Sequence, residues 1–448
     1  MIKIFNICDE TFETDFNVLL ERANMDMDSI IPQVLQTLKD IKSRGEEAIL
    51  ELVRKYDSWN PKSFSDLRIT EEDTFKAYKK LSSKTKESLQ IAYDRIYKFH
   101  AMNIQKGFVY HDEYGNMLGQ NVMPVQRAGI YIPGGKAFYP SSLLMNAIPA
   151  KVAGVKEIIM ASPTPNNHIN DIVLAAMYLC GIKEGYKVGG IGAIGMFAYG
   201  LGNTKWHKGM LTANTQEKKS GFKKVDVITG PGNIYVATAK KLVFGEVNID
   251  MIAGPSEIGI IADSKANSDY IAIDMLSQAE HDSMASAILI TDDKDLANEV
   301  AKKIDSKLKG LKRKEIAQKS IEERGGIIVV QNLCQAVTLM NAIAPEHLEI
   351  LTQNPFELLG DIKSAGAVFL GNYTPEAIGD YLAGPNHTLP TGGSARFFSP
   401  LGVEHFCTRS SLISFSKQGI STLGSHCAAL AEMEGLEAHK LSVLSRLD

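Results

Sequence analysis

The stretch LSQAEHDS, residues 276–283, ends an otherwise apolar segment with an amide, a carboxylate and an imidazole. The preceding residues IAIDM predict a buried helix, on which Gln278 and His281 would lie three positions apart on one face. Both side chains could then reach a single metal ion. Glutamine is an uncommon metal ligand and polar residues at a helix end usually contact only water, so this pair alone leaves both interpretations open.

Three further pairs have groups that can bind a metal or move a proton. Glu346 and His347 are adjacent in IAPEHLEIL, where a helix should stop at Pro345 and a strand should begin. An imidazole with a pKa of about 6.5 can take a proton from an alcohol, and a neighbouring carboxylate can activate water. The alternative is a half-exposed polar pair at the start of a strand. The other two pairs are Asp380 with His387 and Glu434 with His439.

A glycine motif could contact a nucleotide. Gly190, Gly192 and Gly195 in GGIGAIG have the GxGxxG spacing, between a predicted strand and a predicted helix. In dinucleotide-binding folds such glycines let the backbone approach the pyrophosphate. The acidic residue expected about 20 positions further on would fall in a lysine-rich segment. Close packing of a helix on its neighbours is the alternative interpretation.

The composition limits the partners that the protein can have. The chain has 448 residues, 44% of them hydrophobic and 22% charged, and a formal net charge of -4. This is typical of a globular protein with two or three domains, and no basic excess indicates nucleic acid. No secretory pattern opens the sequence and no apolar run could span a membrane, so we expect a cytoplasmic protein with a small-molecule partner. The five scattered cysteines fit neither a disulfide framework nor a thiolate site, so any metal would have nitrogen and oxygen ligands.

The periodicity predicts an α/β fold with two doubly wound, Rossmann-like lobes built on parallel sheets. Residues 29–105 have helical spacing, which gives an N-terminal helical region over 1–127 that we expect to pack on the second lobe. Short apolar runs then alternate with helical stretches, as in βαβ units. We assign the first lobe to 128–255 and the second to 256–382. A helical tail, 383–448, should pack on the body or on another subunit.

Residues 201–224 interrupt the first lobe with six lysines and little apolar periodicity. We predict a loop there. A solvated surface insertion is one interpretation, since long loops lie on the surface. A mobile cover over a site, with Trp206 as its apolar contact, is the other.

Seven motifs are spread over nearly the whole chain: YIPGG (131–135), GPGNIYV (230–236), IDMIAGPSE (249–257), LSQAEHD (276–282), PEHLEI (345–350), GDYLAGPNHTLPTGG (379–393) and AHK (438–440). Together they resemble the L-histidinol dehydrogenase family. The resemblance implies an enzyme that oxidises L-histidinol to L-histidine in two successive hydride transfers to NAD, the last steps of histidine biosynthesis. It also implies a zinc ion and a homodimer whose active sites are shared between the subunits.

The resemblance also implies a role for each matching residue. His347 would be the general base that takes the alcohol proton, and Glu346 would activate the water that hydrates the aldehyde. The zinc ligands would be Gln278, His281, Asp380 and, from the other subunit, His439. The substrate would contact Ser256, Gln278, His281, His347, Asp380, His387, Glu434 and His439, and NAD would contact Tyr131 and Asn233.

Two features depart from the family pattern, and both lie in the first lobe. Gly192 stands where the family usually has a glutamine associated with the cofactor, and the 201–224 segment is longer than in most members. Three alternatives therefore stay open: a related zinc-dependent NAD alcohol dehydrogenase acting on another small polar alcohol such as a sulfonated diol, a metal-dependent hydrolase that uses Glu346, and a non-catalytic binding protein. Glu434 and His439 suit an amino-imidazole substrate, which argues against the first.

Overall fold

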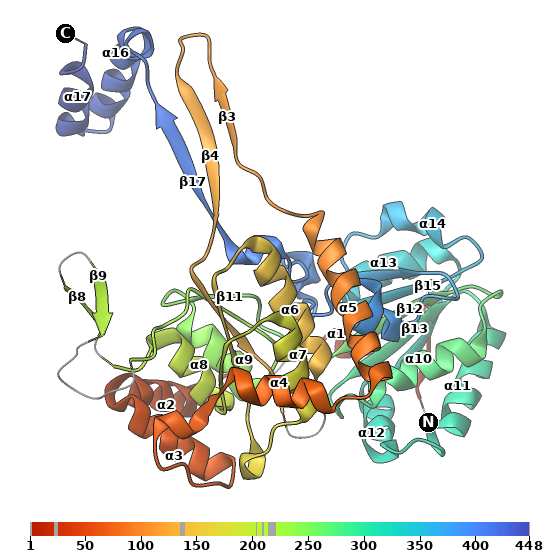
Figure 1. The fold of residues 1–448 in the computed structure, drawn as a ribbon. Coiled ribbons are helices and arrows are strands. Elements are labelled where there is room, and N and C mark those ends of the chain that lie inside the picture. Colours follow the sequence, from red (N-terminus) through yellow and green to blue (C-terminus); the bar gives the residue numbers. More distant parts are fainter. Residues whose placement is uncertain are drawn as a thin grey trace.

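The structure is a computed structural model that describes residues 2–21, 26–134, 139–202, 204–207, 210–213 and 221–447. Two six-stranded sheets with helices on both faces form two lobes, and a long arm extends from them to a pair of helices at the C-terminal end (Figure 1). The predicted α/β class with mainly parallel sheets is confirmed.

The first sheet has the strand order β11-β10-β5-β6-β7-β2. The chain passes from β5 to β6 and β7 in one direction and then returns to β10 on the other side of β5. The order thus reverses between β5 and β10, and in such sheets ligands bind at the carboxyl ends of the strands beside the reversal. The strands are β2 (Arg68–Ile69), β5 (Arg127–Tyr131), β6 (Glu157–Ala161), β7 (Glu184–Tyr186), β10 (Val227–Thr229) and β11 (Asn248–Ile249), with only β2 antiparallel to its neighbour.

Helices cover both faces of the first sheet, because alternate residues of its strands point to opposite faces and both sets are apolar. Ile130 and Met160 pack on one face, whereas Tyr131 and Ile159 pack on the other. The first face has α4 (Glu71–Lys80), α5 (Ser83–Ala101), α6 (Pro140–Ala153) and α7 (Asp171–Cys180), and the second has α2 (Ile31–Arg44), α3 (Glu46–Tyr56), α8 (Gly190–Tyr199) and α9 (Ile234–Val243).

The N-terminal region divides between the two lobes, which differs from the predicted packing of residues 1–127 on the second lobe. Only β1 (Ile4–Asn6) and α1 (Phe12–Glu21) join the second lobe. Helices α2 to α5 pack on the first lobe. Apolar residues of α2 and α3 join a buried cluster with α8 and α9, and those of α4 and α5 join one with α6 and α7. The pattern of apolar residues fixes which face of a helix is buried, but it does not say which partner buries it.

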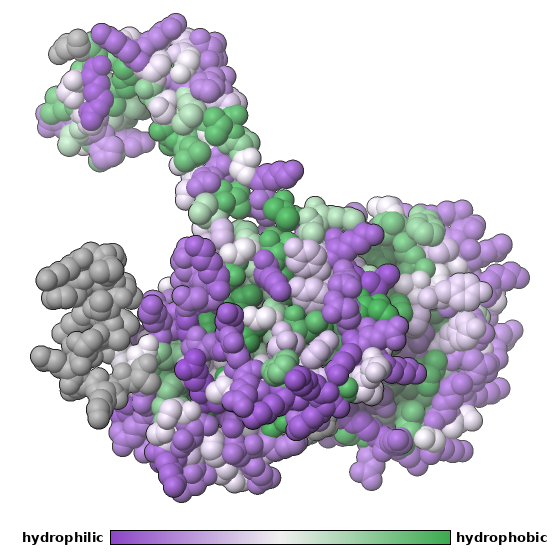
Figure 2. All heavy atoms as spheres, in the orientation of Figure 1, coloured by the Kyte–Doolittle hydropathy of each residue, from purple (hydrophilic) through white to green (hydrophobic). Residues whose placement is uncertain are grey.

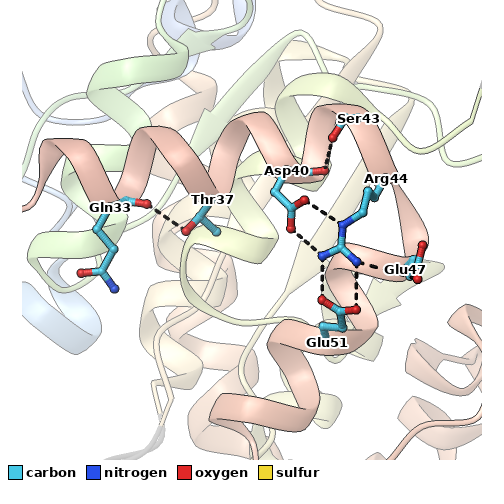
Figure 3. Close-up of polar contacts among 7 residues, drawn as sticks. All are labelled: Gln33, Thr37, Asp40, Ser43, Arg44, Glu47 and Glu51. Atoms are coloured by element: carbon cyan, nitrogen blue, oxygen red, sulfur yellow. Dashed lines mark hydrogen bonds and ion pairs between the residues drawn. The ribbon is translucent and has the colours of Figure 1, made fainter.

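The turn between α2 and α3 is fixed by charge-assisted hydrogen bonds (Figure 3). The guanidinium of Arg44 donates to both carboxylate oxygens of Asp40, at 2.7 and 2.6 Å, and to both of Glu51, at 2.8 and 2.6 Å. Gly45 at the corner has φ 61°, a conformation that suits glycine. Arg44 therefore joins the end of α2 to the first turns of α3 and sets the angle between them.

The second sheet has the order β1-β14-β13-β12-β15-β16, and all of its pairings are parallel. Because α10 follows β12 and precedes β13, it runs back along the sheet and ends at the amino edge of the strands. The strands are β12 (Glu257–Ala262), β13 (Ser286–Thr291), β14 (Gly326–Val329), β15 (His347–Leu351) and β16 (Ala367–Leu370). The main helices are α10 (Ser268–Ala279), α11 (Lys294–Leu308), α12 (Lys314–Arg324) and α13 (Leu333–Ile343).

A three-stranded antiparallel arm departs from the predicted helical regions. It consists of β3 (Phe108–His111), β4 (Met117–Pro124) and β17 (Cys407–Ser414), and it leads to α16 (Lys417–Met433) and α17 (Glu437–Leu444), which lie away from both lobes (Figure 1). We call α16 and α17 together the tail hairpin. Apolar residues are exposed on the arm and on the tail hairpin (Figure 2). Large examples are Phe108, Tyr110, Ile413, Leu430 and Met433. Apolar surface exposed in this way is typical of sites of protein–protein interaction.

The predicted loop at 201–224 contains two short strands, β8 (Thr204–His207) and β9 (Met210–Ala213), paired antiparallel. This corrects the loop prediction for those residues. Residues 203, 208–209 and 214–220 lie outside the described residues, and so does the side chain of Trp206, so the interpretation as a cover stays a prediction.

The glycines of the GxGxxG motif lie where α8 packs closely on its neighbours. A Cβ atom on Gly195 would lie 2.6 Å from Ile41 Cδ1 of α2, and one on Gly192 would lie 3.2 Å from Val188 Cγ1. The N–H of Gly190, at the start of α8, donates to the hydroxyl of Tyr131 at 3.2 Å. These contacts support the packing interpretation of the motif.

We predict that Gly195→Leu destabilises the protein by about 1–3 kcal/mol, because the added atoms would overpack the contact between α8 and α2. The measurement is urea denaturation of the purified variant. Gly360→Leu is the matched control, because a Cβ atom there meets nothing within 4 Å. Equal stabilities for the two variants would contradict the packing role of Gly195.

Candidate active site

The predicted catalytic and metal-binding residues of the second lobe lie at the amino edge of its sheet. His347 is the first residue of β15, Glu346 precedes it, and Gln278 and His281 lie at the end of α10. Asp380 lies in a π-helical turn, Gly379–Ala383, that follows the short helix α15 (Glu376–Ile378) after β16. Because α10 returns to the edge where β15 begins, residues about 70 positions apart in the sequence become neighbours.

His347 is oriented as a proton acceptor. Its Nδ1–H donates to the carbonyl oxygen of Glu257 at 3.0 Å, which leaves Nε2 with its lone pair. The residue is 4% exposed, and this burial lowers the pKa of His347 to about 4. Its Nε2 is buried, receives no hydrogen bond from any described residue and lies 3.8 Å from Asp380 Oδ1. A neutral imidazole with a free Nε2 can take a proton from a bound alcohol.

Glu346 is the second buried group that can accept a proton. One of its carboxylate oxygens accepts from the N–H of Glu257 at 3.0 Å and lies 3.6 Å from His347 Nδ1. Burial raises the pKa of Glu346 well above its usual value, and the charge of Asp380 acts in the same direction. A carboxylate with a raised pKa is a stronger base toward water than an exposed one.

Three side chains form a cluster that could bind a metal ion. One ligand atom each of His281, Glu376 and Asp380 lies within 4.8 Å of the others. Two of the four predicted ligands are therefore together, and Glu376 joins them. Nitrogen and carboxylate oxygen are donors that zinc accepts, and a cation would offset the repulsion between buried carboxylates, so the residues fit the implied metal.

Gln278 is completely buried and contacts the same cluster. Its amide nitrogen lies 2.5 and 2.7 Å from the two carboxylate oxygens of Glu376, and its amide oxygen accepts from the N–H of Glu257 at 3.2 Å. A carboxylate can only accept, so Glu376 fixes which end of the amide faces it. The third predicted ligand therefore lies beside the cluster.

The loop that contains His387 joins the two lobes beside the site. The side-chain amide of Asn386 donates to the carbonyl oxygen of Met145 in α6 at 2.6 Å, and the N–H of Gly392 donates to the Glu257 carboxylate at 3.1 Å. The Nε2 atom of His387 is buried and, among the described residues, has no hydrogen-bond partner. Burial lowers the pKa of His387, so it too can offer a neutral nitrogen to a ligand. Ser256 lies just before β12 on the same edge, where its carbonyl oxygen accepts from the N–H of Ser286 at 3.0 Å.

The predicted cofactor residues lie in the first lobe, on the two sides of its strand reversal. Tyr131 ends β5, and burial raises the pKa of its hydroxyl to about 12, so the hydroxyl stays neutral. Asn233 follows β10 and caps α9, accepting from the N–H groups of Tyr235 at 3.1 Å and Val236 at 3.2 Å. Both therefore lie at the carboxyl edge of the first sheet, where a dinucleotide binds in folds of this type.

Glu434 and His439 are not brought to this site within one chain. They line a hollow of about 540 Å³ between α16 and α17. The tail hairpin that contains them lies beyond the arm, away from both lobes (Figure 1). One chain therefore cannot place His439 beside His281 and Asp380 in this conformation.

Glu376 and the role of Glu257 are not among the residues predicted from the sequence. Glu376 and Asp380 are four residues apart in PEAIGD, a spacing that places two carboxylates on one side of a helical turn and could have indicated the pair. Glu257 acts through its backbone, whose N–H and carbonyl groups contact Glu346 and His347. No sequence pattern indicates a backbone contact between two parallel strands.

The two lobes and this site define the class of the protein. It is an α/β protein with a strand reversal of the nucleotide-binding type in one lobe and a cluster of a buried imidazole and carboxylates on the other. The family model described as histidinol dehydrogenase matches residues 20–447. The chain belongs to the histidinol dehydrogenase family.

Individual relatives agree with this assignment. The chain is 55% identical to the histidinol dehydrogenase of Wolinella succinogenes over 446 residues, which cover 100% of this chain and 99% of the relative. It is 55% identical to that of Helicobacter hepaticus over 437 residues, 98% of this chain and 96% of the relative. The crystal structure of histidinol dehydrogenase from Elizabethkingia anophelis superposes with a TM-score of 0.90 at 33% identity and covers 100% of this chain and 98% of that one. Among the described helices, none has the length and apolar character needed to cross a membrane.

We predict that the ring of His347 in the metal-free protein does not titrate between pH 8 and pH 5. Its pKa of about 4 means that the neutral form persists until the pH approaches that value. The measurement is NMR of histidine-labelled protein, with the His347 signal assigned by its loss in His347→Asn. A midpoint near the ordinary value of about 6.5 would contradict the burial of this side chain.

Proposed function

We propose that the protein is a zinc- and NAD-dependent histidinol dehydrogenase that oxidises L-histidinol to L-histidine through the aldehyde, the last steps of histidine biosynthesis. Membership of the family supports the reaction class. The observation that carries the proposal is the neutral, buried His347, which has a free Nε2. The residue lies between Glu346, whose pKa is raised, and a cluster of nitrogen and oxygen ligands that includes Asp380. The proposal includes a cytoplasmic location.

In this proposal the metal is bound by His281 and Asp380 of one subunit and by His439 of the other, with Glu376 beside them. Gln278 is the fourth ligand through its amide oxygen, which turns from the Glu257 N–H toward the ion. When bound, zinc orients the substrate, because the imidazole and amine of histidinol are themselves good metal ligands. Ser256 and His387 would contact the substrate from the two loops beside β12. Glu434 would contact its protonated amine, since a carboxylate pairs well with an ammonium group.

Tyr131 and Asn233 would contact the nicotinamide nucleotide at the strand reversal of the first lobe. When bound, NAD accepts the two hydrides, one molecule for each oxidation. The buried Tyr131 hydroxyl, neutral because of its raised pKa, adds no charge near the cofactor.

Two neighbouring bases would share the proton transfers. His347 Nε2 takes the proton of the substrate alcohol during the first oxidation. Glu346 takes a proton from the water that adds to the aldehyde and so forms the hydrate for the second oxidation. The two protons leave from different positions, and two groups whose environments push their pKa values in opposite directions suit the two tasks.

We also propose a homodimer with shared active sites. The supporting observations are the exposed apolar residues of the arm and the position of Glu434 and His439 on the tail hairpin (Figure 2). A second subunit that covers the arm would bury this apolar surface, and its own tail hairpin could then reach the cluster on the first.

The direct test is to incubate the protein with zinc, NAD and L-histidinol and follow the absorbance of the reduced cofactor. The proposal expects two equivalents of reduced NAD for each histidinol consumed. Reduction only with other alcohols, such as a sulfonated diol, would indicate a related dehydrogenase. No reduction with any alcohol would favour a hydrolase or a binding protein and contradict the proposal.

We predict that His347→Asn slows oxidation of the alcohol by about 100-fold or more, since loss of a general base typically costs that much. Glu346→Gln should instead mainly slow turnover of the aldehyde. The measurement is kcat with histidinol and, separately, with histidinal as the starting substrate. An unchanged aldehyde step in Glu346→Gln would refute this division of the two roles.

We predict that His439→Asn and Asp380→Asn each lower zinc content and activity, and that mixing the two variants under conditions of subunit exchange restores part of the activity. A mixed dimer would have one site with both defects and one site with neither. The control mixes each variant with itself. Shared sites are excluded if exchange is demonstrated by mass spectrometry and activity does not recover.

A further inference from the structure

A buried ion pair in the first lobe lies apart from the proposed metal site. Lys240 of α9 and Asp250, which follows β11, are 2% and 3% exposed, and the Lys240 ammonium contacts Asp250 Oδ1. Asp250 Oδ1 also accepts from the N–H of Met251 at 2.6 Å. No predicted role in the reaction uses either residue.

Both charges of this pair bind the backbone of the same glycine. The Lys240 ammonium donates to the carbonyl oxygen of Gly230 at 2.9 Å, and Asp250 Oδ2 accepts from the N–H of Gly230 at 2.8 Å. The pair thus fixes the two peptide groups that flank this one residue. Gly230 follows β10 directly and begins the loop GPGN, residues 230–233, which ends at Asn233.

Gly230 has an unusual backbone conformation and packs closely against a neighbouring strand. Its φ of 115° is one that other residues rarely adopt, and a Cβ atom there would lie 2.0 Å from the carbonyl oxygen of Tyr131. The glycine therefore packs directly on the end of β5. The ion pair, through Gly230, sets the spacing between Tyr131 and Asn233, the two residues that flank the strand reversal.

The energetics of buried charges favour a positioning role. A buried ion pair adds little net stability compared with apolar residues of similar size, because desolvation offsets the attraction. Its hydrogen bonds, however, have fixed directions, and here two of them determine the orientation of one loop. Apolar packing could fill the same space without that directional control.

We propose that Lys240 and Asp250 are positioning residues for the nucleotide site, holding loop 230–233 and the start of α9 in the shape that binds the dinucleotide. This inference rests on the proposed function, since it takes NAD as the ligand. Neither residue is expected to touch the reacting atoms, so their loss should weaken cofactor binding and leave the chemistry intact.

The experiment compares wild type with Lys240→Met/Asp250→Asn, which removes both charges and leaves no buried charge unpaired. Calorimetry gives the Kd for NAD, and steady-state kinetics give kcat and the two KM values. We expect the Kd and the KM for NAD to rise about 10-fold or more, while kcat at saturating NAD, the KM for histidinol and the zinc content stay within twofold. The control is Lys303→Met/Asp269→Asn, which removes a surface ion pair of the second lobe and should change none of these values.

The outcomes separate positioning from stability alone. An unchanged affinity for NAD in a folded double variant, with only a lower melting temperature, would overturn the inference. If the double variant does not fold, Lys240→Gln/Asp250→Asn also leaves no buried charge unpaired, keeps a polar group at both positions and should still raise the KM for NAD. Failure of the wild type to bind NAD would overturn the proposed function as well, whereas normal binding by wild type and variants alike would overturn only the positioning role.

Discussion

Burial of several carboxyl groups in one place is the constraint on which the rest of the site depends. Glu346, Glu376 and Asp380 lie close enough for their charges to interact, and burial and mutual repulsion raise the pKa of Glu346 and Glu376 well above the usual values. Such a cluster is costly unless protons or a cation compensate it. A divalent ion compensates the negative charges and leaves the carboxylates unprotonated, so that they can still accept protons during catalysis. The carboxylate of Asp380 lies near the imidazoles of His281 and His347. Burial nevertheless keeps the imidazole of His347 neutral.

The fold places this cluster opposite the strand reversal of the first lobe, because the two sheets present different edges to the junction. The first lobe offers the carboxyl edge of its strands, with Tyr131 and loop 230–233. The second offers its amino edge, where α10 ends and β15 begins. The loop around Asn386 and Gly392 connects the lobes by hydrogen bonds to both of them. A substrate at the junction could therefore contact the proposed base on one side and a nucleotide on the other.

Much of this architecture could be predicted from the sequence, and the exceptions have identifiable physical causes. Alternating apolar runs and helical stretches predicted the parallel sheets, because each strand is buried on both faces. The pair Glu346-His347 was recognisable at the start of a strand, but its depth of burial was not. Glu376 was missed because the helix that places it, α15, has only three residues. The arm was missed because β17, residues 407–414, pairs with β4 from a distant part of the chain. The packing of α2 on α8 depended on glycines whose role becomes clear only when both helices are placed.

In the proposed dimer, one divalent ion binds between the second lobe of one subunit and the tail hairpin of the other. Anomalous X-ray diffraction from zinc-loaded crystals, recorded above and below the zinc absorption edge, locates this ion. We expect one strong anomalous peak per subunit, within bonding distance of His281, Asp380 and His439 of the partner subunit. A zinc-loaded crystal without a peak at that place, or with His439 directed elsewhere in every copy, would contradict it.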